Sequence, residues 1–259
     1  MDVSGQVVVV TGGGQGIGEA LARRFDAEGA LAVVVADLDG ANAQAVAADL
    51  GGNALGMAVD VTDESQIVAL IDRTEATFGP IGLFCGNAGI AVPGGPEVDD
   101  AAWRASLDVN VMAHVWTARH LVPRFAERGG GWYVMTVSAA GLLTQLGSAP
   151  YSVTKHAALA LAEWLAITYG EQGLRVAALC PQAVRTAMTA GVEGGGVAGV
   201  DGMIEPADVA EAVVAGLAAE QFLILPHPEV REYVQRKAAD HERWIGGMQR
   251  LQTRYGSLL

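Results

Sequence analysis

The sequence predicts an α/β protein with one domain, built on a doubly wound, seven-stranded parallel sheet that has helices on both faces. Short runs of β-branched residues alternate along the chain with longer, alanine-rich segments of helical periodicity. The strand-like runs lack alternating polar residues, which is typical of strands buried on both faces of a parallel sheet. No linker, charge run or change in composition divides the 259 residues, so a single domain is expected over 1–259.

The expected elements follow one another in a regular order. Seven strands are predicted at 6–11, 31–37, 54–60, 81–86, 132–138, 174–180 and 222–225. Helices are predicted at 16–28, 41–50, 63–78, 101–128, 151–171 and 206–220. Repeated strand–helix units joined by right-handed crossovers put helices on both faces of such a sheet.

Two segments depart from this alternation. The segment 186–203 is too rich in glycine for a regular element, and we expect it to form a mobile substrate loop over the active-site end of the sheet. A C-terminal helical extension over about 229–259 carries apolar residues at a spacing of three or four, with a bend expected at Gly246 and Gly247. Packing on its own domain, an oligomer contact and the edge of a lid are all open roles for this extension.

Composition and charge narrow the class of protein. A net charge of −13 opposes binding to nucleic acids or anionic membranes, which requires a basic surface. The apolar runs fall short of the roughly 18 residues of a membrane span, and no signal peptide is visible, so a cytoplasmic protein is expected. Cys85 and Cys180 have no metal-ligand spacing, and the five histidines form no cluster. No metal and no disulfide are expected.

A glycine-rich turn lies between the first predicted strand and the first predicted helix. Glycines let the backbone turn tightly and approach a pyrophosphate, and the helix N-terminus supplies free N–H groups and a positive dipole. An ordinary strand-to-helix loop is the weaker alternative. We therefore expect a dinucleotide site of Rossmann type that involves Thr11, Gly12, Gly14, Gln15, Gly16, Ile17 and Gly18.

The end of the second predicted strand indicates which dinucleotide is bound. Asp37 stands where a carboxylate can accept hydrogen bonds from both adenosine ribose hydroxyls and repel a 2′-phosphate. The basic residues that NADP selectivity requires are absent, because Gln15 lies in the turn and Leu38 follows the acid. The expected cofactor is therefore NAD. Asp60, with Val61, is expected either to contact the adenine edge or to form a turn.

A tyrosine and a lysine indicate the chemistry. Tyr151 and Lys155 are one helical turn apart, so their side chains project from the same face of the predicted helix. The cation favours the phenolate and is expected to lower the pKa of Tyr151 from its ordinary value of about 10. The phenol could then exchange a proton with an alcohol or a ketone, and Ser138 would hold the substrate oxygen. Taken alone, such a pair is most often a solvated surface pair.

Together these motifs resemble the short-chain dehydrogenase/reductase family, and the resemblance covers nearly all of residues 5–226. Asn87, Ala88 and Gly89 match the family's Asn-Ala-Gly motif, which implies that they support the sheet beside the cofactor. Asn110 matches a further family asparagine, which implies that it holds a water connecting the catalytic lysine to solvent. The alternative for Asn110 is a helix-interior side chain bonded to a backbone group.

The resemblance also implies roles for the reacting residues. Tyr151 would act as the acid/base, Ser138 would orient the substrate oxygen, and Lys155 would lower the pKa of the tyrosine. Tyr151 and Lys155 would also contact the nicotinamide ribose. Thr186 matches the residue that binds the nicotinamide carboxamide, and Pro181 lies on the same side of the cofactor.

The chain departs from the family pattern at two positions. Gly86 stands where the family commonly has an asparagine, and Gln182 stands where it usually has a glycine. Since glutamine adopts positive φ less readily than glycine, either the local backbone differs or the amide faces the substrate. The residues expected to contact the substrate are Ala140, Gln145, Gln182 and Met188. Among basic residues only Arg185 is expected nearby, so a highly anionic substrate is disfavoured.

These observations predict an NAD-dependent oxidoreductase that transfers a hydride between the nicotinamide and a moderately hydrophobic secondary alcohol or ketone. A catalytically silent NAD(H)-binding sensor or oligomeric interaction protein is the alternative from a different class. The long helices over 103–125 and 151–169 resemble those through which family members associate, so a homodimer or homotetramer is expected.

Overall fold

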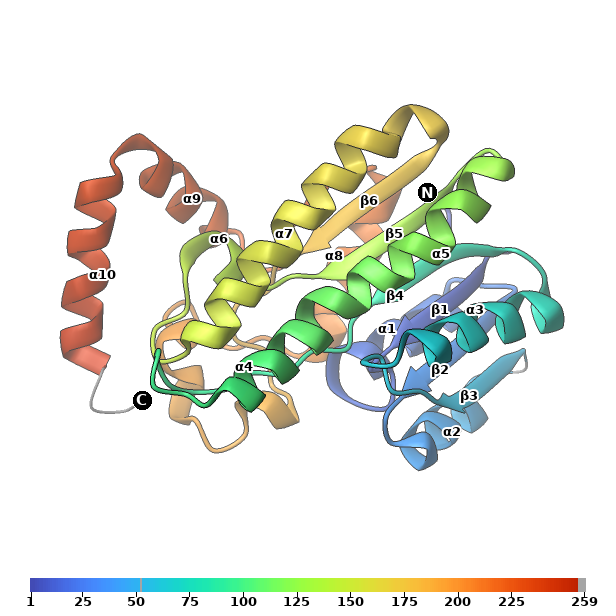
Figure 1. Ribbon diagram of the computed structural model, residues 1–259, viewed down its shortest axis with the longest axis horizontal. Helices are drawn as coiled ribbons and strands as arrows, with labels where there is room; N and C mark the ends of the chain where they lie inside the picture. Colours follow the sequence, from blue (N-terminus) through green and yellow to red (C-terminus); the bar gives the residue numbers. More distant parts are fainter. Residues whose placement is uncertain (52, 256–259) are drawn as a thin grey trace.

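The computed structural model describes residues 1–51 and 53–255, and it forms three layers with a parallel sheet between two layers of helices (Figure 1). The strands are β1 (Val7–Thr11), β2 (Ala32–Asp37), β3 (Ala54–Ala58), β4 (Ile81–Gly86), β5 (Gly131–Thr136), β6 (Leu174–Leu179) and β7 (Leu223–Ile224). They lie in the order β3-β2-β1-β4-β5-β6-β7, and every neighbouring pair is parallel. The predicted Rossmann-type architecture is confirmed.

Each face of the sheet has its own apolar core. One core is formed with α3 (Glu64–Phe78), α5 (Ala113–Glu127) and α7 (Ala149–Tyr169), and the other with α1 (Gly16–Ala27), α2 (Gly40–Asp49) and α8 (Pro206–Ala218). In β1, Val7 and Val9 belong to the first core, whereas Val8 and Val10 belong to the second. All four side chains are buried, which explains why the strand sequences lack polar alternation.

The strand order reverses between β1 and β4. In an open α/β sheet, the ligand crevice lies beyond the carboxyl ends of the strands at such a reversal. The residues that follow β1, β2, β4, β5 and β6 therefore meet at one edge of the sheet, although they are far apart in the sequence. This edge contains every motif on which the sequence analysis depends.

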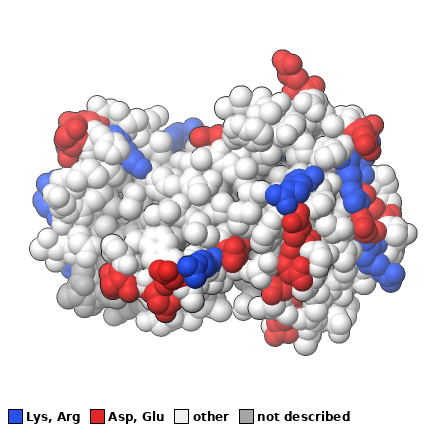
Figure 2. Space-filling view, in the orientation of Figure 1, with Lys and Arg blue, Asp and Glu red and all other residues white. Residues whose placement is uncertain are grey.

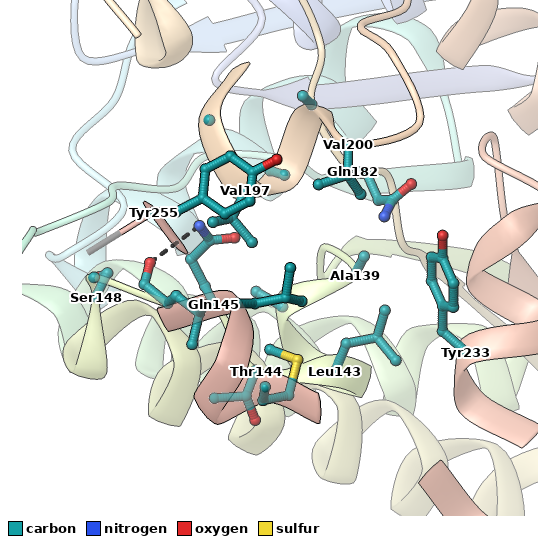
Figure 3. A pocket seen from close by; sticks show the side chains of 18 of the residues that line it. Ala139, Leu143, Thr144, Gln145, Ser148, Gln182, Val197, Val200, Tyr233 and Tyr255 are labelled. Carbon is teal, nitrogen blue, oxygen red and sulfur yellow. Dashed lines mark hydrogen bonds between the residues drawn. The ribbon is translucent and has the colours of Figure 1, made fainter. Parts of the chain in front are cut away.

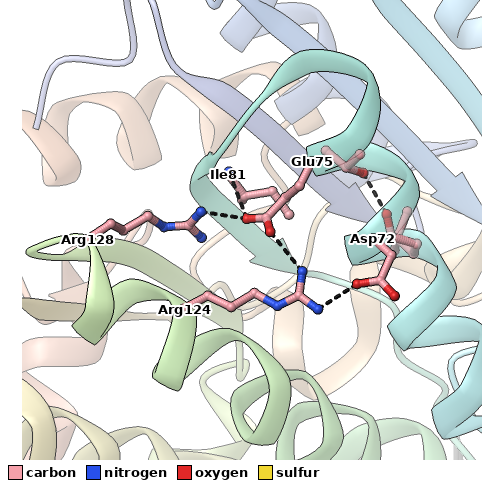
Figure 4. Close-up of polar contacts among 7 residues, drawn as sticks. Asp72, Glu75, Ile81, Arg124 and Arg128 are labelled. Carbon is pink, nitrogen blue, oxygen red and sulfur yellow. Dashed lines mark hydrogen bonds and ion pairs between the residues drawn. The ribbon is translucent and has the colours of Figure 1, made fainter.

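An ion-pair network fastens α3 to α5 at the opposite end of the sheet (Figure 4). Arg124 donates to Glu75 at 2.7 Å and to Asp72 at 2.5 Å, and Arg128 donates to Glu75 at 2.6 Å. Glu75 also accepts the backbone N–H of Ile81 at the start of β4. Glu75 is largely shielded from solvent, and several charges share the network. The network therefore stabilises the packing of α3 against α5 more than an isolated surface ion pair would.

The helix predicted over 101–128 is divided into three parts. α4 (Asp100–Leu107) and α5 are joined by a π-helical turn, η1 (Asp108–Met112), and they follow one another along one line in Figure 1. Hydrophobic periodicity does not reveal this turn, because the same face stays buried on both sides of it. Single π-turns occur frequently at functional sites, and this one contains Asn110.

The C-terminal extension forms two helices, α9 (Glu229–Ala239) and α10 (His241–Tyr255), that project from the body of the molecule (Figure 1). The bend predicted at Gly246 and Gly247 is wrong, because both glycines lie inside α10. The chain turns instead at Asp240, which has extended dihedral angles and accepts the N–H of Arg243 as an N-cap. No residue of α10 is buried.

The glycine-rich segment is not wholly irregular. It contains two short 3₁₀ helices, η3 (Ala187–Thr189) and η4 (Glu193–Gly199). Three successive glycines in η4 have positive φ, at 58°, 77° and 58° for Gly194, Gly195 and Gly196. The chain here folds back on itself and bonds to the segment after β6, where Ala183 N donates to Ala198 O at 3.1 Å. Its predicted mobility stays a prediction.

The described part of the chain has no helix that is long and apolar enough to cross a membrane. Over residues 1–51 and 53–255, no group of three or more metal-binding side chains comes together. Acidic and basic side chains lie mostly side by side on the face seen in Figure 2, and much of the surface between them is uncharged.

Candidate active site

The glycine-rich turn after β1 is shaped by close contacts as well as by backbone angles. Gly12 and Gly16 have φ values of +61° and +57°, which favour glycine. A Cβ on Gly18 would lie 2.0 Å from the carbonyl oxygen of Gly12, so only glycine fits where α1 passes over the turn. Gln15 precedes α1 with extended angles and provides no side-chain cap. The first N–H groups of α1 are therefore free to bind an anion.

Asp37 lies directly beside this turn. Its Oδ2 accepts the N–H of Gly14 at 2.8 Å, and its Oδ1 accepts the N–H of Asp39 at 3.0 Å. These bonds fix the carboxylate next to the turn, where each oxygen keeps a free lone pair. Leu38, the following residue, is 75% exposed and brings no positive charge. The geometry is suited to ribose hydroxyls and unfavourable to an additional phosphate.

The Asn-Ala-Gly segment after β4 connects three strands. Asn87 Nδ2 donates to the carbonyl oxygens of Thr11 and Gly12, both at 3.2 Å, and its backbone N–H donates to Thr11 Oγ1 at 3.0 Å. Thr136, at the end of β5, donates to Asn87 Oδ1 at 3.1 Å. A Cβ on Gly12 would lie 2.8 Å from the Cα of Ala88. The segment therefore supports the glycine-rich turn; its role beside a bound cofactor stays a prediction.

Asp60 follows β3 and forms a turn. Its Oδ1 accepts from the backbone N–H and the hydroxyl of Thr62, at 2.9 Å and 2.7 Å. This is the turn-forming alternative that the sequence left open. Val61 packs at the edge of the first core. Contact of either residue with an adenine ring stays a prediction.

Tyr151, Ser138 and Lys155 come together between β5 and α7. Ser148 caps α7 by accepting the N–H of Tyr151, which places Tyr151 in the first turn of that helix. Lys155 is 2% exposed, and its Nζ donates to the carbonyl oxygen of Thr136 at 2.8 Å. The Nζ atom lies 5.6 Å from the centre of the Tyr151 ring. Lys155 is thus buried and Tyr151 is half-buried on the same helix face, so the two do not form a solvated surface pair.

Ser138 is held in a strained conformation. Its φ is 86°, which is uncommon for a residue with a side chain. The backbone N–H groups of Val137 and Ser138 both donate to Leu179 O, at 2.8 Å and 3.0 Å. Ala139 N donates to the carbonyl oxygen of Pro181 at 2.9 Å. Bonds to the segment at the end of β6 therefore hold the strained backbone in place, and the serine hydroxyl itself donates to Pro181 O at 3.4 Å.

The acid–base properties of the pair are dominated by burial. Burial raises the pKa of Tyr151, and a hydrogen bond with the Ser138 hydroxyl partly opposes this increase. Burial also lowers the pKa of Lys155 to about 8. The direction for Tyr151 is opposite to the decrease expected from helical spacing alone. Spacing identifies the neighbouring charge, but it does not reveal how much water the fold removes.

Asn110 is completely buried and fully bonded. Its Oδ1 accepts the N–H of Ile90 at 3.0 Å, and its Nδ2 donates to Ile90 O at 2.9 Å and to Thr154 Oγ1 at 3.0 Å. This is the backbone-bonded alternative from the sequence analysis. A Cβ on Gly89 would lie 3.3 Å from both Asn110 Oδ1 and Lys155 Nζ, so the three residues are neighbours. A water relay at Asn110 stays a prediction.

The backbone after β6 can accept a glutamine at position 182, where the family usually has a glycine. Gln182 is not among the residues with positive φ, so its backbone is unstrained. Its N–H donates to Nδ1 of the buried His227 at 3.2 Å. Its Oε1 is buried and has no hydrogen-bond partner among the described residues. Thr186 lies over the glycine-rich turn, since a Cβ on Gly16 would meet its methyl group at 3.1 Å.

Tyr151 borders a cavity of about 1330 Å³; Figure 3 shows part of its lining, including Leu143, Gln145 and Gln182. Tyr151 and Ser138 lie in its wall, together with all four predicted substrate residues, Ala140, Gln145, Gln182 and Met188. Its remaining lining is mainly apolar and comes from the segment before α7, the glycine-rich segment and the C-terminal helices. A site that combines apolar walls with a few directed polar groups is typical of small-molecule binding.

The C-terminal helices provide cavity residues that the sequence analysis missed. Arg185 does not line this cavity; Arg236, Arg243, Arg250 and Arg254 do. The expectation that no other basic side chain lies near the substrate is therefore wrong. The physical reason is that α9 and α10, although they project from the body of the molecule, form part of the cavity wall, which hydrophobic spacing alone does not reveal. The arginines on one stripe of α10 were the available signal.

A second missed feature lies behind Lys155. Buried His114 bonds through Nδ1 to the hydroxyl of Tyr133 at 2.8 Å, and its Nε2 has no partner among the described residues. Burial, and to a smaller extent the charge of Lys155, lower the pKa of His114 to about 3. A Cβ on Gly86 would lie 2.8 Å from His114 Nδ1 and 2.9 Å from the Tyr133 hydroxyl. The family's asparagine is thus excluded here by the histidine–tyrosine pair.

Comparisons with known proteins agree with this geometry. The family model described as short chain dehydrogenase matches residues 6–194. The 1-deoxy-11-beta-hydroxypentalenate dehydrogenase of Streptomyces exfoliatus is 36% identical over 238 residues, which is 89% of this chain and 86% of the relative. The cis-4-hydroxycyclohexanecarboxylate dehydrogenase of Sinomonas cyclohexanicum is 36% identical over 248 residues, which is 93% of this chain and 92% of that enzyme.

A solved structure extends the agreement to three dimensions. A short chain dehydrogenase/reductase from Burkholderia phymatum in complex with NAD matches with a TM-score of 0.85 and 27% identity, over 93% of this chain and 96% of that one. The chain therefore belongs to the short-chain dehydrogenase/reductase family, oxidoreductases that use NAD(P) and act on CH–OH groups.

Proposed function

We propose that this protein is an NAD-dependent dehydrogenase of apolar, ring-containing secondary alcohols, with Tyr151 as the acid/base. The observation that carries the proposal is the position of Tyr151 and Ser138 in the wall of a large apolar cavity. The same edge of the sheet carries the glycine-rich turn and Asp37. The site thus combines a place for a dinucleotide with a proton-transfer group facing a substrate space.

The residues around the turn fit a dinucleotide. Gly12, Gly16 and Gly18 form a cradle that side chains would fill, and the N-terminus of α1 has free N–H groups for the phosphates. Asp37 would accept the adenosine ribose hydroxyls, Tyr151 and Lys155 would contact the second ribose, and Thr186 with Pro181 would border the nicotinamide. The carboxylate and the absence of a neighbouring base support NAD over NADP.

Each reacting residue has a separate task. Hydride acceptance is the chemistry that the nicotinamide supplies when bound. Tyr151 takes the hydroxyl proton of the alcohol, and Ser138 donates a hydrogen bond to the substrate oxygen and holds it against the phenol. Lys155 brings a positive charge to the buried phenol and favours its ionised form. In the reverse direction, Tyr151 donates the proton to a ketone.

The substrate space favours a molecule with a sizeable apolar body. The cavity is larger than most pockets for drug-sized ligands. The two enzymes compared above are named for ring-containing alcohols, a hydroxypentalenate and a hydroxycyclohexanecarboxylate. These names support a ring-containing secondary alcohol as the substrate class.

An exposed apolar stripe on α7 supports assembly into a homodimer or homotetramer. Val153, Trp164 and Ile167 are 52%, 52% and 82% exposed, and their spacing places them on one side of the helix. Large apolar side chains grouped on one surface are typical of interfaces. Analytical ultracentrifugation of wild type and Ile167→Lys tests this, with a smaller species expected for the variant and an unchanged species contradicting it.

An activity panel tests the proposed function. Purified protein is mixed with NAD or NADP and a set of cyclic and acyclic secondary alcohols, and the absorbance of the reduced cofactor is followed. We expect turnover with NAD and cyclic alcohols, at a higher kcat/KM than with NADP. Tight NADH binding without turnover on any alcohol would instead support a catalytically silent sensor.

A further inference from the structure

The substrate cavity has a charge opposite to that of the whole chain. The chain carries 29 acidic residues against 16 basic ones, for a net charge of −13. Among the described residues that line the cavity, however, the charged ones are Arg236, Asp240, Arg243, Arg250 and Arg254. Four cations and one carboxylate thus surround a space in a strongly acidic protein. The general composition does not explain this excess of positive charge.

The arginines of α10 gather on the side of the helix that faces the cavity. Arg243, Arg250 and Arg254 recur at intervals of seven and four residues, so they form one stripe. A parallel apolar stripe, one residue further along, also lines the cavity; it contains Trp244, Met248, Leu251 and Tyr255. On the opposite side of α10, Ile245 is 47% exposed and does not line the cavity. α10 therefore presents a face that is half apolar and half cationic.

The arginine stripe has no carboxylate partner among the described side chains. Elsewhere, Arg23, Arg24 and Arg124 each meet two carboxylates. On α9, Arg236 pairs with Glu232. The one acidic residue described at the cavity, Asp240, already accepts the N–H of Arg243 as the cap of α10. Within the part of the chain that the structure describes, no carboxylate neutralises the stripe, so it is suited to binding an anion.

One cavity joins the arginine stripe to the reacting residues. Tyr151, Ser138 and the arginine stripe all lie in its wall, and apolar side chains such as Leu143 and Val197 line the same space. A molecule held by its hydroxyl at Tyr151 would place an apolar body in this space. A group at its far end would reach α10, where guanidinium groups can bind a carboxylate through paired hydrogen bonds.

We propose that the arginine stripe of α10 (Arg243, Arg250 and Arg254) selects substrates that carry a carboxylate remote from the reacting hydroxyl. This inference rests on the proposed function, since it assigns the substrate class of the same site. The apolar stripe covers the body of the hydroxy acid, and the arginines bind its carboxylate. The alternative is that these arginines only extend into solvent beside an apolar helix face. In that case the enzyme would not distinguish a hydroxy acid from its uncharged ester.

The test compares hydroxy acids with their methyl esters, which keep the ring and hydroxyl but remove the charge. The probes are cis-4-hydroxycyclohexanecarboxylate and hydroxycyclohexyl alkanoates in which the chain is lengthened by one methylene at a time. Each is assayed with NAD against wild type, the triple variant Arg243→Gln/Arg250→Gln/Arg254→Gln, and Arg231→Gln. Arg231 is an exposed α9 residue that does not line the cavity, so it controls for loss of charge.

We expect wild type to prefer at least one acid over its ester by roughly 10-fold to 100-fold in kcat/KM, the range of one or two charge-assisted hydrogen bonds. The preference should reside in KM and decline as salt is added. The triple variant should lose it, and Arg231→Gln should keep it. Alcohol oxidation without an acid preference, or with a preference that survives in the triple variant, overturns this inference alone. If no alcohol is oxidised, the proposed function fails together with it.

Discussion

The glycine-rich turn after β1 and helix α10 border the same site, but they are held in different ways. Around the turn, Asn87 bonds to Thr11, Asp37 accepts the backbone N–H of Gly14, and Gly18 excludes any side chain. In α10, by contrast, no residue is buried. Close to the substrate side, the buried Gln182 Oε1 and His227 Nε2 have no partner among the described residues.

This difference in packing suggests that the well-bonded cofactor side carries out the chemistry, whereas the less buried α10 side determines which substrate is used. A site that must bring a cofactor, a hydroxyl and a phenol together requires groups that are fixed by packing and second bonds. A site that must accept a particular substrate depends on surfaces that differ between relatives and tolerate movement. Changes on the cofactor side should therefore affect folding, NADH binding or turnover. Changes on α10 should affect which substrate is used.

The largest effect is expected from Tyr151→Phe. The variant keeps the ring and its packing but removes the hydroxyl that is proposed to accept the alcohol proton, so turnover should fall by about 10²–10⁴-fold. NADH affinity, measured by fluorescence titration, should change little. Turnover close to that of wild type would remove Tyr151 from proton transfer.

Acid should destabilise the protein through His114. Burial first, and then the charge of Lys155, lower the pKa of this histidine from 6.5 to about 3. Between these values the unfolded chain binds a proton that the folded chain does not, so stability falls as pH decreases. The loss at about pH 4 should be roughly 3 kcal/mol.

Denaturant unfolding of wild type and His114→Gln at a series of pH values measures this contribution. Glutamine is neutral throughout and can still form a hydrogen bond with Tyr133, so the variant should show a shallower dependence on pH. Equal slopes for the two proteins would show that another group carries the acid sensitivity.

Gly18→Ala should damage the cofactor side directly. The new methyl group would lie 2.0 Å from Gly12 O, so the helix or the turn must move. Overpacking of this kind costs about 1–3 kcal/mol of unfolding free energy, and NADH affinity should fall with it.

Gly170→Ala is the matched control for Gly18→Ala. It follows α7 with φ −58°, and a Cβ there would meet nothing within 4 Å. Thermal unfolding and NADH titration of both variants test whether close packing at Gly18 shapes the turn. If Gly18→Ala behaves like its control, close packing does not shape the turn.

The smallest effect is expected from Asp37→Ala, which removes the carboxylate bonded to Gly14. The ratio of kcat/KM for NAD to that for NADP should fall by about 10-fold, the value of one or two hydrogen bonds and a lost repulsion. Steady-state kinetics with both cofactors measure the ratio. A wild type that already prefers NADP would contradict the assignment of NAD.

The same contrast explains what could be predicted from the sequence. The turn, Asp37, Asn87 and the Tyr151–Lys155 pair were accessible because chain order and local spacing place them at the ends of consecutive strands. The bend at Gly246 was wrong because the Asp240 cap, and not glycine content, ends one helix and begins the next. The direction of the Tyr151 pKa was missed because burial is a property of the fold.

Other features depend on contacts between distant segments. Gly86 stands in place of the family's asparagine because a side chain there would collide with His114 and Tyr133, which come from α5 and β5. The α10 arginines reach the substrate cavity only because the last two helices form part of its wall. Neither relation follows from local pattern, since each requires knowing which surfaces meet.

Direct hydride transfer is the most immediate test of the account. A cyclic secondary alcohol deuterated at its carbinol carbon is incubated with the enzyme and NAD, and the reduced cofactor is analysed by mass spectrometry. We predict that NADH carries the deuterium, that the reaction needs Tyr151, and that a tertiary alcohol of the same shape gives no NADH. Formation of unlabelled NADH, or no reduction of NAD by any secondary alcohol, would contradict the account.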